Sequence, residues 1–234
     1  DLPDSIYSTD ILIINGHPPC CSNNQGRQEN FDALIQFIHD AKTFGGIIDL
    51  PINTPISFSG DMNLVGYSEQ YNTIINGTIS DTILFGNGGF PDWDNTQLED
   101  QICYINEKNI AYTWDKSNSS IGDYPPGRLD FVFFTNSVMS VDKSFIISTE
   151  HMSPSLLIQN NLFSNDTKIA SDHLPIIVDF ILPTVVQTSI DGYKTRKEKI
   201  GIIDLLGREV YDIKYNPLFY IYDDGTVEKK IVIE

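Results

Sequence analysis

The chain has 234 residues, enough for one large domain or for one domain with a small module. Its hydrophobic content of 41% is ample for a packed core, and no apolar run approaches the length of a membrane span. The net charge of −17 argues against broad electrostatic adhesion to nucleic acid, although the charge at a cleft matters more than the sum.

The first elements predicted are a strand and a helix. Residues 10–15 are largely apolar and predict a buried strand that ends at His17. Residues 30–41 predict a helix, because their apolar positions recur at the spacing of one helical face. These positions are Phe31, Leu34, Ile35 and Ile38. His39 lies off that face, and we expect it to be solvated.

The middle of the chain alternates a strand, a short helix and loops. Residues 55–58 predict a second strand, and residues 67–75 predict a short helix closed by the Asn76–Gly77 turn. Residues 81–127 are rich in loops. Their aromatic residues Trp93, Trp114 and Tyr124 are candidates for lining a cleft, with packing roles at least as well supported. We expect their acidic residues Asp92, Asp94 and Asp115 to form a solvated loop rather than a calcium site.

Later strands are predicted at residues 129–134 and 143–148, as neighbours in one sheet that residues 176–182 close. Pro183 marks a boundary. Beyond it, three β-like runs at 200–206, 218–222 and 226–233 are separated by turn signals, which are Gly207–Arg208 and Asp223–Asp224–Gly225. The only cluster approaching a basic patch, 194–199, lies in this tail.

Three acidic motifs carry the chemistry. Residues 60–63 follow a predicted strand, residues 128–131 open one, and residues 171–175 precede one. The last motif places Asp172 beside His173, a base that titrates near neutral pH. Each motif alone has a simpler explanation. Residues 60–63 could be a plain turn, residues 128–131 a surface ion pair, and residues 171–175 a strand-entry cap with a hydrogen-bonded histidine. Together they indicate metal-assisted attack on a phosphoester, which needs hydroxide near neutrality and neutralisation of the phosphoryl oxygens.

The ordered set resembles the endonuclease/exonuclease/phosphatase superfamily, which includes deoxyribonuclease I, abasic-site endonucleases, neutral sphingomyelinases and inositol-phosphate phosphatases. The resemblance covers roughly residues 10 to 182. The matched positions are Gly60, Asp61 and Asn63 for G-D-x-N, residues 128–131 for R-[LI]-D-[YF], residues 171–175 for S-D-H-x-P, and Asn15 with His17 for N-x-H. It implies an α/β (α+β) fold, part of a four-layer α/β/β/α sandwich of the deoxyribonuclease I type.

The resemblance also implies roles for six residues. His173 would be the general base or charge stabiliser, and Asp130 would orient its imidazole. Asp61 would position water or a metal, and Asn63 would donate to a phosphoryl oxygen. Asp172 would help to bind the metal. His17 would contact the phosphate or assist the leaving group. The implied cofactor is Mg²⁺, or alternatively Mn²⁺ or Ca²⁺.

The sequence departs from the family pattern at its start. The family's first half supplies an Asn on an early strand and a metal-binding Glu, and only ten residues precede Ile11. We therefore expect residues 1–182 to be the carboxy-terminal portion of such a domain, with poor metal affinity and one apolar sheet face lacking its partner. Reading the coding DNA upstream of Asp1 tests this expectation.

After a linker at 183–190, residues 191–234 resemble the carboxy-terminal sorting domain of the type IX secretion system. Residues 204–210 match its D-x-x-G-[RK]-x-[VI] pattern, whereas Pro217 replaces a glycine usual in the next strand. The resemblance implies the type IX export machinery as a partner and a secreted or cell-surface location. The alternative is a small β accessory module.

Three cysteines, Cys20, Cys21 and Cys103, leave an odd count. One of Cys20 or Cys21 could bridge to Cys103, one could have lost a partner upstream, or all could be buried free thiols. Zinc ligation is not expected, because no Cys/His pairs occur at ligand spacing.

The leading hypothesis is therefore a secreted, metal-dependent hydrolase of phosphodiester or phosphomonoester bonds. Its substrate could be nucleic acid, a phospholipid headgroup or a small phosphate ester, and the acidity of the chain modestly favours the small ester. The alternatives are a catalytically inert fragment and a surface-displayed binding protein on the same scaffold.

Overall fold

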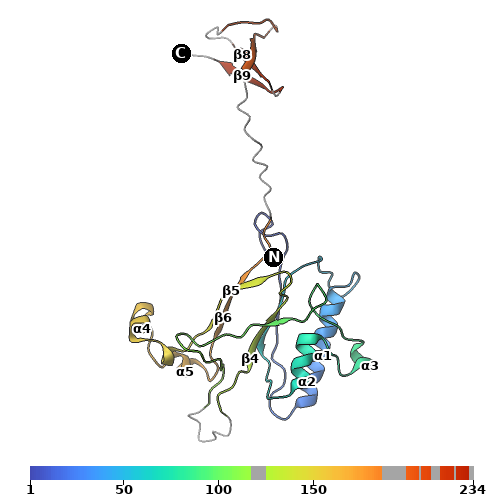
Figure 1. Cartoon of the computed structure of the whole chain (residues 1–234), viewed down its shortest axis with the longest axis vertical. Helices are drawn as coiled ribbons and strands as arrows, with labels where there is room; N and C mark the ends of the chain where they lie inside the picture. The colour runs from blue at the N-terminus through green and yellow to red at the C-terminus, as the bar shows by residue number, and fades with distance from the viewer. Residues whose placement is uncertain (117–124, 186–198, 206, 212–216, 224, 232–234) are drawn as a thin grey trace. The chain divides into compact units, whose positions relative to one another are not determined.

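The computed structural model (Figure 1) describes residues 1–116, 125–185, 199–205, 207–211, 217–223 and 225–231. It divides into two compact units, Asp1–Val185 and Val186–Glu234. Several sequence-based predictions fall partly or wholly outside the described residues: Tyr124 as a cleft residue, most of the linker at 183–190, nearly all of the basic cluster 194–199, and single positions of the runs and turns predicted after residue 199. No helix in the described ranges combines the length and the apolarity that a membrane span requires.

A four-stranded sheet forms the centre of the first unit. It consists of β1 (Leu12–Asn15), β2 (Ile56–Asp61), β3 (Glu99–Asp100) and β4 (Asp130–Phe134), in the order β1-β2-β4-β3. The first pair is parallel and the other two pairs are antiparallel. Because β2 and β4 run in opposite directions, the end of β2 meets the start of β4, and Asp61 is the register partner of Asp130.

Two helices lie side by side against this sheet, α1 (Asn24–Ala41) and α2 (Ser68–Asn76), followed by the short α3 (Thr82–Phe85) (Figure 1). The side chain of Asn23 accepts a hydrogen bond from the Gly26 N–H and caps α1, so the helix begins six residues before the predicted start. Gly77 ends α2 in the left-handed conformation, as its turn signal predicts. The core between sheet and helices comprises Phe31, Leu34, Ile38, Ile56, Phe58, Met62, Ile74, Ile75, Leu98, Phe131 and Phe133.

The second sheet corrects a prediction. β5 (Ser140–Ile146) pairs antiparallel with β6 (Ile176–Ile181), and neither joins β4. Both edges of β4 are already taken by β2 and β3, so no edge of that strand remains for β5. The rings of Phe134 and Phe180, with centroids 5.5 Å apart, connect the two sheets. The unit is a mixed α/β structure, and the four-layer sandwich remains a prediction.

Short helical turns separate β5 from β6. They are η1 (Thr149–His151), α4 (Pro154–Asn160) and α5 (Asp166–Ala170). His151 lies outside the motifs and has a structural environment: its Nδ1 lies 2.8 Å from Ser148 Oγ.

Expectations about exposure are wrong for His39 and for Asp92, whereas Asp94 is exposed as expected. His39 is half-buried rather than solvated, and its Nε2 lies 2.9 Å from the carbonyl oxygen of Gly89. Asp92 is fully buried. Its carboxylate accepts hydrogen bonds from the N–H of Trp93 and from Ser137, which follows β4, and these bonds compensate for the loss of water. One carboxylate of the predicted acidic loop, that of Asp92, is therefore part of the packed structure.

The second unit contains a three-stranded antiparallel sheet, β7 (Lys199–Ile203), β8 (Pro217–Tyr222) and β9 (Val227–Ile231), in the order β7-β8-β9. Strand positions agree with the predicted runs, and Gly207 and Gly225 both take positive φ at the predicted turns. Among the residues described there, Leu218 is fully buried and Tyr220 nearly so.

Candidate active site

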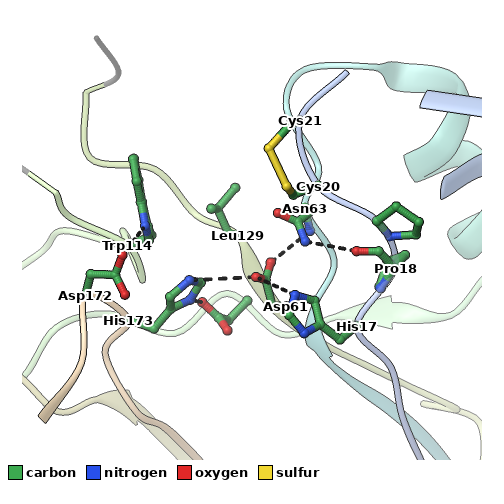
Figure 2. A network of polar contacts seen from close by, with 12 residues as sticks. His17, Pro18, Cys20, Cys21, Asp61, Asn63, Trp114, Leu129, Asp172 and His173 are labelled. Carbon is green, nitrogen blue, oxygen red and sulfur yellow. Dashed lines mark hydrogen bonds and ion pairs between the residues drawn. A yellow bond between two sulfur atoms is a disulfide. The ribbon is translucent and has the colours of Figure 1, made fainter. Parts of the chain in front are cut away.

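The predicted site residues gather at one edge of the central sheet (Figure 2). Asp61 ends β2, Asp130 begins β4, His17 follows β1, and His173 lies just before β6. Four segments that are far apart in sequence thus bring their polar side chains together. Figure 2 shows the imidazoles of His17 and His173 both turned toward Asp61.

His173 and Asp130 form the tightest pair of the site. Nδ1 of His173 lies 2.7 Å from Oδ2 of Asp130, and both side chains are mostly buried. Nε2 of the same ring lies 3.7 Å from Oδ2 of Asp61. A carboxylate at Nδ1 favours the tautomer that carries its proton there and leaves Nε2 as an acceptor. The geometry therefore suits an imidazole that takes a proton at Nε2.

Thr113, which the sequence reasoning did not single out, holds Asp130 in place. Its Oγ1 accepts hydrogen bonds from the N–H groups of Leu129, at 3.0 Å, and Asp130, at 2.9 Å, and the residue is fully buried. A single threonine in a loop-rich stretch gives no sequence signal for such a role. Only the fold reveals that it fixes the start of β4.

Asp61 lies between the two histidines. Its Oδ2 is 3.4 Å from Nε2 of His17 and 3.7 Å from Nε2 of His173, while its Oδ1 accepts a hydrogen bond from the Asn63 N–H at 2.9 Å. The last contact is the local turn bond expected of any Asp-x-Asn sequence. Asp61 thus makes the turn and faces both imidazoles. His17 is largely exposed, with 72% of its side chain accessible.

The G-D-x-N turn brings β2 unusually close to β1. Gly60 has φ +140°, and a Cβ placed there would lie 2.0 Å from the carbonyl oxygen of Gly16. Only glycine permits both that conformation and that approach. The close contact sets the ends of β1 and β2 side by side, and hence His17 beside Asp61.

Asn63 is almost fully buried, and its Nδ2 donates to the carbonyl oxygen of Pro18 at 3.0 Å. One of its two amide hydrogens is therefore engaged within the protein. The structure gives Asn63 a role in holding the loop after β1, and donation to a phosphoryl oxygen remains a prediction.

Asp172 turns toward Trp114 rather than toward Asp61 (Figure 2). Its exposed carboxylate accepts a hydrogen bond from Trp114 Nε1 at 3.2 Å. Of the predicted cleft aromatics, Trp114 thus lies at the site, whereas Trp93 donates its Nε1 hydrogen to the Thr54 carbonyl and packs under Lys42.

The described residues do not fit the implied metal. Among them, no group of three or more His, Cys, Asp or Glu side chains could hold a metal ion. Both oxygens of Asp61 already have protein neighbours, and Asp172 bonds Trp114. Magnesium requires several oxygen ligands in octahedral geometry, so we assign no step to it.

Arg128, from the R-[LI]-D-[YF] motif, ties strands together instead of facing the site. It pairs with Asp100 on β3 through both terminal nitrogens and stacks over the Phe131 ring at 4.0 Å. The pair is mostly buried, so it is not the surface ion pair that the sequence left open. Tyr71 also donates a hydrogen bond to Asp100. Burial, and to a smaller extent the Asp100 carboxylate, raises the pKa of Tyr71 to about 12.

The structure settles the pairing of the cysteines, which the sequence left open. Cys20 and Cys21 form a disulfide with each other, and Cys103 is free and buried. Cys103 packs with Ile105 and Ile146 under the second sheet, whereas the other two lie in the loop after β1. Burial raises the pKa of the Cys103 thiol.

Two cavities of the first unit are lined by residues other than His173 and Asp61. One of about 530 Å³ lies between the first turns of α1, α2 and residues 80–83. The other, of about 30 Å³, lies beside Ser171 and Asp172.

No family model and no curated protein matches the chain. Two solved structures of D. rerio TDP2 are similar to it. One is a complex with a single strand DNA product, with a TM-score of 0.41 and 19% identity, covering 72% of this chain and 55% of that chain. The other is TDP2 humanized by 14 mutations, with a TM-score of 0.39 and 18% identity, covering 72% and 54%.

TDP2 is a member of the superfamily that the motifs resemble. The chain spans about half the length of these solved structures. At this level of similarity, the family assignment stays a prediction that depends on the motifs.

Proposed function

We propose that this chain carries the histidine and aspartate part of a phosphoester hydrolase site, which cleaves phosphodiester or phosphomonoester bonds by attack of water. The observation that carries the proposal is the position of the His173 imidazole, with Asp130 at Nδ1 and Asp61 facing Nε2. A histidine so held can take a proton at a defined atom, which is what activation of water requires.

The proposed reaction uses the residues at the sheet edge. A water between His173 and the substrate gives a proton to Nε2, and its oxygen forms the new bond to phosphorus while the bond to the leaving oxygen breaks. Asp130 and Asp61 stabilise the resulting imidazolium. His17, exposed on the other side of Asp61, donates a proton to the leaving oxygen or a hydrogen bond to the phosphate.

The predicted use of Mg²⁺, Mn²⁺ or Ca²⁺ is treated as an experimental variable, since the described residues supply no complete set of ligands. The purified chain is incubated with bis-p-nitrophenyl phosphate and with p-nitrophenyl phosphate, each metal being compared with EDTA. We expect release of p-nitrophenolate above the background of an Asp130→Ala variant. If the coding DNA continues upstream, the longer protein is assayed in the same way.

Two outcomes would contradict the proposal. Equal rates for wild type and the folded Asp130→Ala variant would show that the pair at the sheet edge is not the reaction centre. No turnover by either length of protein, on these esters, short single-stranded DNA and a phospholipid, would favour the inert fragment or the surface-displayed binding protein.

We also propose that residues 191–234 address the protein to the type IX export machinery, and hence to the cell surface or the medium. The support is a separate unit whose D-x-x-G-R motif forms a closed turn: Gly207 has φ 78°, and Arg208 Nε donates to Asp204 Oδ2 at 2.8 Å.

The proposed export role is tested by fusing residues 183–234 to a reporter protein in a bacterium that has the type IX system. We expect export of the reporter, and its retention in cells when Asp204 and Arg208 are both replaced with Ala. A reporter that stays inside with the intact tail would contradict the proposal.

A further inference from the structure

The segment after β1, residues 16–20, is here called the His17 loop. Gly16 makes the last backbone hydrogen bond to β2, from its N–H to the Ser59 carbonyl at 2.9 Å. Pro18 and Pro19 then have no N–H to donate, so the loop cannot extend the ladder. Beyond the close contact between Gly60 and Gly16, the position of His17 can therefore be fixed by groups that bind the loop carbonyls.

Two side chains do so at adjacent carbonyls. Asn63 donates from Nδ2 to the Pro18 carbonyl at 3.0 Å, and Arg27 donates from Nη1 to the Pro19 carbonyl at 2.7 Å. Asn63 follows β2, whereas Arg27 lies on α1. The His17 loop is thus held by two different elements, close to the histidine that faces Asp61.

Arg27 is an energetically unfavourable residue to bury at this position. It is fully buried, and its three acceptors are neutral oxygens: the Pro19 carbonyl, the side-chain oxygen of Gln70 at 2.7 Å from Nε, and the side-chain oxygen of Asn24. Among the described residues no carboxylate bonds this guanidinium, and burying it in that way is unfavourable. Burial lowers the pKa of Arg27. The planar guanidinium presents several N–H donors in fixed directions, which the rotating ammonium group of a lysine does not.

Those directions connect three elements. Gln70 belongs to α2 and is itself buried, with its Nε2 donating to the Asn24 carbonyl at 3.0 Å. The guanidinium therefore joins the start of α1, the first turn of α2 and the His17 loop. A displacement of either helix would be passed through Arg27 to Pro19, two residues from His17.

We infer that Arg27 is a positioning residue, which fixes the imidazole of His17 beside Asp61 by holding the Pro19 carbonyl. Its effect on turnover rests on the proposed function, whereas its effect on the place of His17 does not. The competing explanation is that Arg27 only stabilises the packing of α1 on α2.

The test compares Arg27→Lys and Arg27→Met with Thr73→Val. Thr73 is fully buried on α2 and bonds Gln28 of α1, so its variant weakens the same helix pair without touching the loop. The first measurement is the ¹H–¹³C NMR signal of the His17 ring, with those of His39 and His151 as internal references. We expect the His17 signal to shift or split in both Arg27 variants and to stay in place in Thr73→Val.

The second measurement is turnover of bis-p-nitrophenyl phosphate. A displacement of about 1 Å at a reacting group costs on the order of 100-fold, so we expect kcat to fall by about 10- to 100-fold in Arg27→Met, with KM little changed. We expect Thr73→Val to keep its rate. An unmoved His17 signal in a folded Arg27 variant would overturn the inference, whereas a moved signal with unchanged kcat would count against the part of His17 in the proposed reaction.

The two proposals fail separately. A wild type without turnover would count against the hydrolase, while the NMR comparison would still decide the role of Arg27. If neither Arg27 variant folds, Gln70→Leu replaces them, because it removes the Nε acceptor and keeps the guanidinium. The same two outcomes then apply to the His17 signal.

Discussion

Replacing His173 with alanine is expected to lower kcat for bis-p-nitrophenyl phosphate by about 10²–10⁴-fold, the usual contribution of a general base. The variant loses the atom that lies 3.7 Å from Asp61 and the ring that Asp130 orients. KM is expected to change less, because proton transfer contributes only in the transition state. Steady-state kinetics with each metal and with EDTA measure both constants.

The matched control is His39→Ala, which removes an imidazole of similar burial from the same unit. His39 contacts Gly89 and none of the site residues, so this variant is expected to keep the wild-type rate. Asp130→Asn tests the orientation of the ring, since an amide that donates toward Nδ1 would select the wrong tautomer. If His173→Ala retained its rate, the assignment of the base would be wrong.

Replacing Gly60 with alanine is expected to destabilise the first unit by about 3–5 kcal/mol, the sum of a backbone strain and an overpacking cost. The added Cβ would lie 2.0 Å from the Gly16 carbonyl oxygen, at a φ of +140° that side chains rarely adopt. The ends of β1 and β2 must then separate, which moves His17 away from Asp61. Urea unfolding followed by circular dichroism measures the loss.

Gly66→Ala is the control for this substitution. Gly66 also has a positive φ, at +95°, but no atom lies within 4 Å of the place where its Cβ would be. We expect it to cost about 1–2 kcal/mol, which is the conformational cost alone. An equal loss of stability in the two variants would show that the close approach of β2 to β1 adds nothing to the destabilisation by Gly60→Ala.

Four of the six residues to which the resemblance assigns roles lie together, and the reason is geometric. Asp61 and Asp130 occur where strands end and begin, and antiparallel pairing of those strands makes them register partners. His17 ends a strand parallel to the first of these. Positions at strand ends are readable from a sequence, whereas their gathering at one sheet edge was only implied by the resemblance. Their catalytic roles remain predictions.

Other features depend on contacts that a sequence does not display. Arg27 stands on a helix among polar neighbours, which is typical of a solvated residue, and its burial follows only from the neutral oxygens around it. β5 was expected beside β4, but strand pairing depends on which edges are free. The sequence left the pairing of Cys103 open, and the fold decides it: Cys103 is buried under the second sheet, away from the loop that carries Cys20.

The order of the central sheet has a practical consequence for anyone who prepares this protein. In the part of the chain that the structure describes, β1 has a neighbour on one side only, and Ile13 on that strand is two-thirds exposed. A strand with open backbone donors and acceptors is a template onto which another chain can add. Dilute samples checked by light scattering are therefore needed before any rate or melting curve is attributed to the monomer.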